Sequence, residues 1–165
     1  MENLKKIVIV DDDIDIIAAV ESILTAKGYK VLSANDKKEG LALIMKENPD
    51  LAILDVMMTT QFEGFELAEE MAKNATLSHI PVIIQTSIEV LTTTKPSVQA
   101  MAQQFRQNPD YSDLRVILVK DILTGNAGVD YLNENNEGVW FPVSAFVKKP
   151  VNAAVLLPEI EKLIK

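Results

Sequence analysis

The chain has 165 residues, of which 48% are hydrophobic and 24% are charged, and its formal net charge is -8. This composition is that of a globular protein, and the negative charge, with no Lys or Arg cluster longer than a pair, argues against direct binding of nucleic acid. The chain lacks cysteine, which excludes disulfides and a Cys nucleophile. We find neither a signal-peptide pattern nor an apolar run that could span a bilayer, so we expect a cytoplasmic protein with no membrane partner.

The first element is a short apolar run, Ile7 to Val10, that ends in Asp11, Asp12 and Asp13. A run rich in β-branched residues, without polar alternation, predicts a strand buried on both faces of a parallel sheet. One interpretation of Asp13 is that it caps a following helix. Three adjacent carboxylates exceed what capping requires, and at the carboxyl end of a strand they predict a site for a hard cation.

Helices and strands are then expected to alternate along the chain. In order, we expect a helix at 14–27, a strand at 29–34, a helix capped by Asn35 or Asp36, a strand at 51–54, a helix at 64–75 and a strand at 80–85. A fifth strand is expected at 146–150 and a last helix at 152–165. Because a proline inside a helix removes a hydrogen bond, we expect this helix either to bend at Pro158 or to begin near it. This alternation predicts a parallel sheet with right-handed crossovers.

Functional side chains follow four of these strands: Asp11 and Asp12, then Asp55, then Thr86, then Lys149. Each is common by itself, but their order and their positions at strand ends indicate one site. Mg²⁺ is usually held by one or two carboxylates and keeps other positions for phosphate oxygens. A further carboxylate can attack phosphorus while a lysine and a hydroxyl stabilise the phosphoryl oxygens, so the set predicts a phosphoacceptor.

At these residues the sequence resembles the receiver domain of two-component response regulators. The matching stretches are Ile7–Asp13, Pro49–Met58, Pro81–Ser87 and Phe146–Pro150, and the resemblance covers residues 4–88 and 143–165. It implies an α/β, flavodoxin-like, doubly wound sheet of five parallel strands in the order 2-1-3-4-5. It also implies a single, stand-alone receiver domain over residues 1–165, with an inserted segment at about 89–142.

The resemblance further implies the role of each site residue. Asp55 is expected to be phosphorylated, Asp12 to bind Mg²⁺ directly and Asp11 to bind it through water. Asp55 itself and the backbone carbonyl of Met57 complete the expected metal ligands. Thr86 resembles the switch hydroxyl that moves onto the phosphoryl group, and Lys149 its charge partner. Phe146 occupies the aromatic switch position, which is more often Tyr, and therefore lacks a phenol hydroxyl.

Some positions depart from the family pattern. Thr59 stands where the family usually has Pro, and Ser87 replaces a smaller residue. Met57 and Ile88 stand two residues beyond Asp55 and Thr86, at positions that tune phosphate loss in the family. Because neither side chain can orient an attacking water, we expect slow autodephosphorylation, and a phosphoryl lifetime of seconds would contradict this.

Between Thr86 and Lys149 lie 62 residues. One helix of about 12 residues with two short loops would suffice to connect the two strands, so roughly forty residues are extra. Lys95 to Ser97 begins a predicted helix that ends at Asn108. Residues 114–119 fit either a strand or one side of a helix, and residues 124–128 and 133–138 have the composition of loops. The segment also holds the one Trp, at 140. Its aromatic residues either pin the segment to the sheet edge or form a partner surface.

Parts of the sequence also fit other classes of protein. Phosphatases of the haloacid dehalogenase type also place Asp-x-Asp after a first strand, which Asp11 and Asp13 match. That family needs a further acidic pair after its Lys, where this chain offers only Glu159 and Glu161 on a predicted helix. The other alternative is a receiver-like adaptor that is never phosphorylated, which the complete residue set does not support.

We therefore predict a phosphoacceptor signalling protein with Mg²⁺ as its cofactor. Its expected partners are a histidine kinase or a histidine phosphotransfer protein, which donates the phosphoryl group, and an unknown downstream protein; the prediction also allows a homodimer. No enzymatic activity is expected beyond the protein's own phosphorylation and dephosphorylation.

Overall fold

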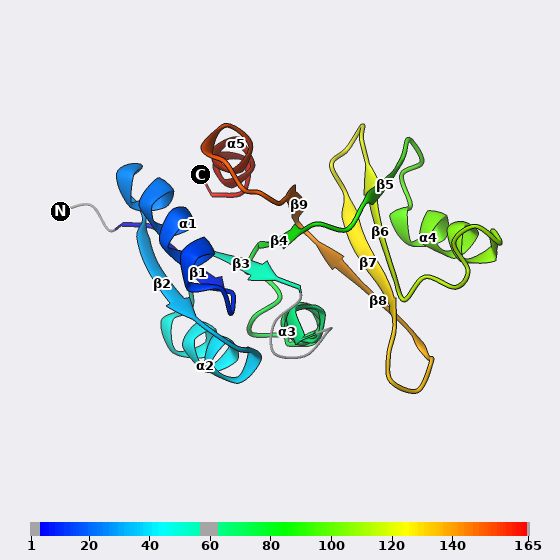
Figure 1. The fold of residues 1–165 in the computed structure, drawn as a ribbon, viewed down its shortest axis with the longest axis horizontal. Helices are drawn as coiled ribbons and strands as arrows, with labels where there is room; N and C mark the ends of the chain where they lie inside the picture. Colours follow the sequence, from blue (N-terminus) through cyan, green and yellow to red (C-terminus); the bar gives the residue numbers. More distant parts are fainter. Residues whose placement is uncertain (1–3, 57–62, 165) are drawn as a thin grey trace. The chain divides into compact units, whose positions relative to one another are not determined.

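The computed structural model describes residues 4–56 and 63–164, and the chain divides into two compact units (Figure 1). The first unit comprises Met1–Ser87 and Val147–Lys165, and the second comprises Ile88–Phe146. The second unit thus includes the whole segment expected as an insertion. The grouping of both units into one receiver domain stays a prediction.

A five-stranded sheet forms the centre of the first unit. Its strands are β1 (Lys6–Val10), β2 (Lys30–Ala34), β3 (Leu51–Asp55), β4 (Val82–Thr86) and β9 (Ala145–Lys148), in the order β2-β1-β3-β4-β9. The boundary between the two units falls within β9, after Phe146. The pairs β1–β2, β1–β3 and β3–β4 are parallel. Because β9 is the fifth strand of this sheet, the predicted order 2-1-3-4-5 is confirmed. β3 and β4 are buried at every residue, which explains their almost continuous apolar sequences.

Helices cover both faces of this sheet. Figure 1 shows α1 (Ile14–Ala26) and α5 (Ala153–Leu163) on one side, and α2 (Lys37–Glu47) and α3 (Glu63–Lys73) on the other. Asp13 caps α1 by accepting a hydrogen bond from the Asp15 amide at 2.9 Å, and Asp36 caps α2 through the Glu39 amide at 2.8 Å. Since α5 begins at Ala153 and continues through Pro158, the predicted start near that proline is wrong. None of the helices in the described ranges has the length and apolarity to cross a bilayer.

One close packing contact identifies the face that α2 and α3 cover. A Cβ atom added to Gly40 of α2 would lie 2.8 Å from Cγ2 of Val10 and 3.3 Å from Cδ2 of Leu67 in α3. The Val10 side of the sheet therefore lies against α2 and α3. Because successive residues of a strand project from opposite faces, the residues beside Val10 project toward the side of α1 and α5.

The second unit has a four-stranded sheet of its own. Its elements are β5 (Val90–Thr93), α4 (Val98–Gln107), β6 (Val116–Asp121), β7 (Ala127–Leu132) and β8 (Gly138–Val143). The sheet order is β5-β6-β7-β8, in which β5 runs parallel to β6 and the other pairs are antiparallel. The predicted helix after Ser97 is confirmed, and residues 116–121 form a strand rather than a helix. The loops predicted at 124–128 and 133–138 are wrong at their ends, where Ala127 and Gly128 begin β7 and Gly138 begins β8.

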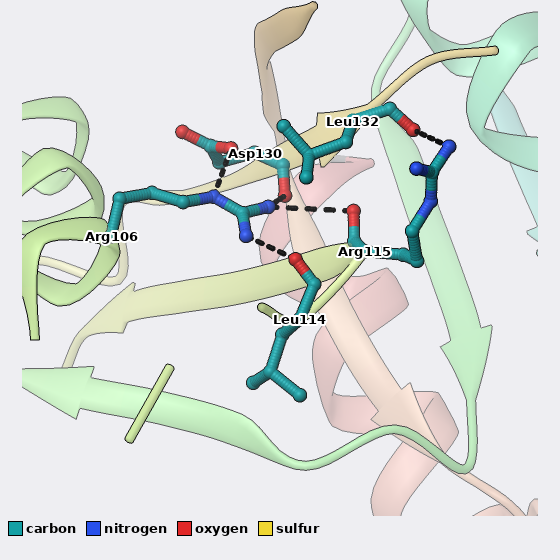
Figure 2. Close-up of polar contacts among 5 residues, drawn as sticks. All are labelled: Arg106, Leu114, Arg115, Asp130 and Leu132. Carbon is teal, nitrogen blue, oxygen red and sulfur yellow. Dashed lines mark hydrogen bonds and ion pairs between the residues drawn. The ribbon is translucent and has the colours of Figure 1, made fainter. Parts of the chain in front are cut away.

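Arg106 ties α4 to the sheet of the second unit (Figure 2). Its Nε atom donates to Oδ1 of Asp130 in β7 at 2.9 Å, and its terminal nitrogens donate to the carbonyls of Leu114 and Arg115. Arg115 in turn donates to the Leu132 carbonyl at 2.8 Å. Beside these contacts, α4 packs its apolar side on β6 in a cluster of Val98, Ala102, Ile117 and Val119. Apolar packing and buried charge pairing together hold this unit.

Candidate functional site

Three carboxylates gather where β1 and β3 end. One oxygen each of Asp11, Asp12 and Asp55 lies within 4.8 Å of the other two. Asp11 and Asp55 are buried, whereas Asp12 is exposed. Parallel strands bring their carboxyl ends to one edge of the sheet, and this geometry places the three acids together as the sequence predicted.

Lys149 supplies the positive charge beside these acids. Its Nζ atom lies 2.5 Å from Oδ1 of Asp55 and 4.0 Å from Oδ2 of Asp11. The backbone amide of Lys149 donates to the carbonyl of Thr86 at 2.9 Å, so the end of β4 holds the residue in position. The short ion pair orients the Asp55 carboxylate and leaves less repulsion between Asp55 and Asp11.

The two oxygens of Asp11 differ in their surroundings. Oδ1 accepts a hydrogen bond from the Asp13 amide at 2.9 Å, whereas Oδ2 is buried without a hydrogen-bond partner among the described residues. Burial, more than any other cause, raises the pKa of Asp11 from 3.8 to about 6, with further increases from the charges of Asp55 and Asp12. A divalent cation would satisfy Oδ2 and offset this repulsion. The oxygen donors present therefore fit Mg²⁺.

The remaining predicted residues lie in or beside the same sheet. Thr86 is buried at the end of β4, and Phe146 is half-buried within β9. Met57 lies outside the described residues, so the expected role of its carbonyl stays a prediction. The cap role of Asp13, which the sequence left open, is confirmed.

Two residues of this region were not singled out as functional from the sequence. Gly64, in the first turn of α3, passes so close to β3 that an added Cβ atom would lie 1.8 Å from the Asp55 carbonyl oxygen. Gln85 is completely buried between Ile84 and Thr86 in β4. A signal existed for Gln85, since a polar amide is unusual inside a buried apolar strand. The sequence does not predict that position 64 requires glycine, because a glycine near the start of a helix occurs for many reasons.

The sequence is similar to known proteins of one family. It matches the family described as the response regulator receiver domain over residues 7–118. The probable transcriptional regulator ycf27 of Cyanophora paradoxa is 40% identical over 86 residues, which are 52% of this chain and 34% of that protein. The protein PilH of Pseudomonas aeruginosa is 34% identical over 84 residues, which are 51% of this chain and 69% of PilH. The chain thus spans about a third of the length of the ycf27 relatives.

Solved structures agree with the fold. A CheY-like response regulator receiver domain protein from Methanospirillum hungatei superposes with a TM-score of 0.60 at 27% identity, covering 97% of this chain and 93% of that one. CheY4 of Vibrio cholerae gives a TM-score of 0.60 at 22% identity, covering 98% of this chain and all of CheY4, and this likeness shows the fold alone.

The fold and the acidic edge define an α/β protein of the flavodoxin-like, receiver type. Since the family match covers more than half of the sequence, the chain belongs to the response regulator receiver domain family, whose members act in two-component signalling. The match includes Asp11, Asp12, Asp55 and Thr86 and ends at Leu118 in β6, before Phe146 and Lys149. Family membership favours the receiver interpretation over the phosphatase alternative.

Proposed function

We propose that this protein accepts a phosphoryl group on Asp55 in a Mg²⁺-dependent reaction and thereby changes its contact with another protein. The observation that carries the proposal is the pairing of Lys149 with Asp55, 2.5 Å apart, beside a carboxylate whose Oδ2 lacks a hydrogen-bond partner among the described residues. A lysine so placed both orients the carboxylate that attacks and stabilises the phosphoryl oxygens that follow.

In the proposed reaction an oxygen of Asp55 attacks the phosphorus of a phosphohistidine. A P–O bond forms and the P–N bond breaks, and the histidine nitrogen keeps the electron pair. Asp11, Asp12 and Asp55, together with the Met57 carbonyl, would hold Mg²⁺, which supplies neutralising charge for the phosphoryl oxygens. Lys149 stabilises the charge that develops, and the hydroxyl of Thr86 engages the phosphoryl group of the product. Phe146 then reports the change from its position in β9.

We propose a histidine kinase or histidine phosphotransfer protein as the donor. Membership of the receiver domain family supports a protein donor of this kind, because members of this family act in two-component signalling. The signal then passes to a downstream protein through the altered contact. The chemistry of the protein itself is limited to gaining and losing the phosphoryl group.

The test is phosphorylation of the purified protein by acetyl phosphate, read by intact mass. We expect one added phosphoryl group in the wild type with Mg²⁺, and none with a chelator or in Asp55→Asn. Asp15→Asn is the matched control, because Asp15 is an exposed acid of α1 outside the carboxylate group. Normal folding without any added mass in the wild type would contradict the proposal and favour the non-phosphorylated adaptor.

A further inference from the structure

Gln85 occupies an unusual environment in β4. Its side chain has no exposed surface, and neither Nε2 nor Oε1 has a hydrogen-bond partner among the described residues. The three residues that precede it in the strand, Val82, Ile83 and Ile84, are all buried and apolar. A buried amide without partners destabilises the state that contains it, and an apolar residue of similar shape would fit this environment better.

The sheet register places Gln85 beside the phosphoacceptor. Gln85 pairs with Asp55, and side chains of paired residues in parallel strands project from the same face. One residue beyond the last pair of β1 and β3, Val10 with Leu54, Asp11 continues this row. Asp11, Asp55 and Gln85 thus follow one another across three adjacent strands. Both ends of the row carry buried polar atoms without partners among the described residues.

Gln85 lies away from α2 and α3. The Val10 face of the sheet packs against those two helices, and the row of Asp11, Asp55 and Gln85 belongs to the opposite face, toward α1 and α5 (Figure 1). Both polar atoms of Gln85 have less than 1 Å² of exposed surface, so solvent does not satisfy the amide in this arrangement. A partner must therefore come from a change in the residues around it.

Phosphorylation would bring such a change to this row. A phosphoryl group on Asp55 adds three strong acceptor oxygens beside a side chain whose NH₂ group lacks an acceptor. Thr86, which directly follows Gln85, is the residue proposed to move onto that group. A shift of Thr86 moves the backbone that it shares with Gln85.

We propose that Gln85 is a positioning residue of the phosphorylated state, whose amide lacks hydrogen-bond partners while Asp55 is unmodified and gains them when Asp55 is phosphorylated. The unpaired amide destabilises the resting state and so favours phosphorylation. This inference rests on the proposed function of Asp55. It assigns a role to a residue that does not itself react.

The experiment compares the wild type with Gln85→Met and Gln85→Leu, which replace the amide by apolar groups of similar volume. Urea unfolding without ligand gives the stability of the resting state. Beryllofluoride with Mg²⁺, a stand-in for the aspartyl phosphate, is then titrated, and the increase in stability gives its apparent Kd. The matched control is Ile83→Met, because Ile83 is fully buried two residues earlier on the same face of β4.

Without ligand, the two Gln85 variants are expected to be at least as stable as the wild type. With beryllofluoride, they are expected to bind about tenfold more weakly, as the loss of one hydrogen bond to a charged acceptor implies. Ile83→Met should leave the apparent Kd unchanged. Equal or tighter binding in both Gln85 variants, or lower stability of both without ligand, would overturn the inference.

The outcome for the wild type separates this inference from the proposed function. If the wild type neither binds beryllofluoride nor accepts a phosphoryl group, the proposed function fails and the role of Gln85 fails with it. If the wild type and both Gln85 variants bind beryllofluoride equally well, only the role of Gln85 fails.

Discussion

The Nζ atom of Lys149 lies 2.5 Å from Oδ1 of Asp55, although 94 positions separate the two residues in the sequence. The Asp55 side chain is 3% exposed and that of Lys149 is 22% exposed, so this pair is largely shielded from water. A buried carboxylate that loses such a partner still bears the free-energy cost of its desolvation but loses the attraction that offset this cost. The pair therefore contributes to stability as well as to the proposed chemistry.

Lys149→Met should lower the free energy of unfolding at neutral pH by about 2 kcal/mol, less than for a fully buried pair because the lysine is partly exposed. Urea unfolding followed by circular dichroism measures this change. Lys148→Met is the matched control, since Lys148 is the exposed neighbour, and it should stay within about 0.5 kcal/mol. Equal effects of the two substitutions would contradict the structural role of the ion pair.

Asp11 gives the stability a pH dependence. Because its pKa is raised from 3.8 to about 6 in the folded protein, the folded state binds the proton more tightly than the unfolded state. The stability contributed by this proton is present below the unfolded value and is lost as the pH rises through about 6. The free energy of unfolding is compared for the wild type and Asp11→Asn in the presence of a chelator. Between about pH 4 and about pH 7.5, that of the wild type should fall by about 2 to 3 kcal/mol relative to that of Asp11→Asn. A constant difference between the two proteins would contradict the raised pKa.

Mg²⁺ should bind at the group formed by Asp11, Asp12 and Asp55. Asp12 is its exposed member, so Asp12→Asn should leave the fold intact while weakening Mg²⁺ binding about tenfold or more, as the loss of a charged ligand implies. Calorimetric titration measures the affinity. Asp15→Asn should bind Mg²⁺ as the wild type does, and a similar loss in both variants would indicate a general effect of charge.

Gly64 is required by the close approach of α3 to β3. In Gly64→Ala the added Cβ atom would lie 1.8 Å from the Asp55 carbonyl oxygen, so the backbone must move. We expect a loss of about 3 kcal/mol or more in unfolding free energy and slower phosphorylation by acetyl phosphate, since Asp55 is displaced. Gly138→Ala, where no atom lies within 4 Å of the added Cβ, should change neither quantity. A stable, fully active Gly64→Ala would contradict the observed packing.

The first unit could be predicted from the sequence because its buried strands are short apolar runs that end in polar residues. The position of Asp11, Asp12 and Asp55 at one edge follows from parallel strands alone. The bounds of β9 differ slightly, since Ala145 rather than Phe146 begins it. Family resemblance supplied the roles of individual residues, which the strand pattern does not contain.

The sheet of the second unit could not be predicted in the same way. Gly128 is typical of a turn, but in the structure it lies in β7 and packs closely against Trp140. The Cη2 atom of Trp140 would be 2.3 Å from a Cβ atom added to Gly128. β5 pairs directly with β6, although α4 lies between them in the sequence. Local periodicity does not predict such a pairing. The hydrogen bonds of Arg106 likewise depend on the assembled unit. Within the site, the environment of Gln85 and the raised pKa of Asp11 also arise only from tertiary burial.

The most direct test of the account is the location of the phosphoryl group. After reaction with acetyl phosphate and Mg²⁺, borohydride reduces an aspartyl phosphate to homoserine, and peptide mass spectrometry identifies the converted residue. We expect conversion at Asp55 alone. Conversion at Asp11 or Asp12, or at no aspartate of a folded protein, would contradict it.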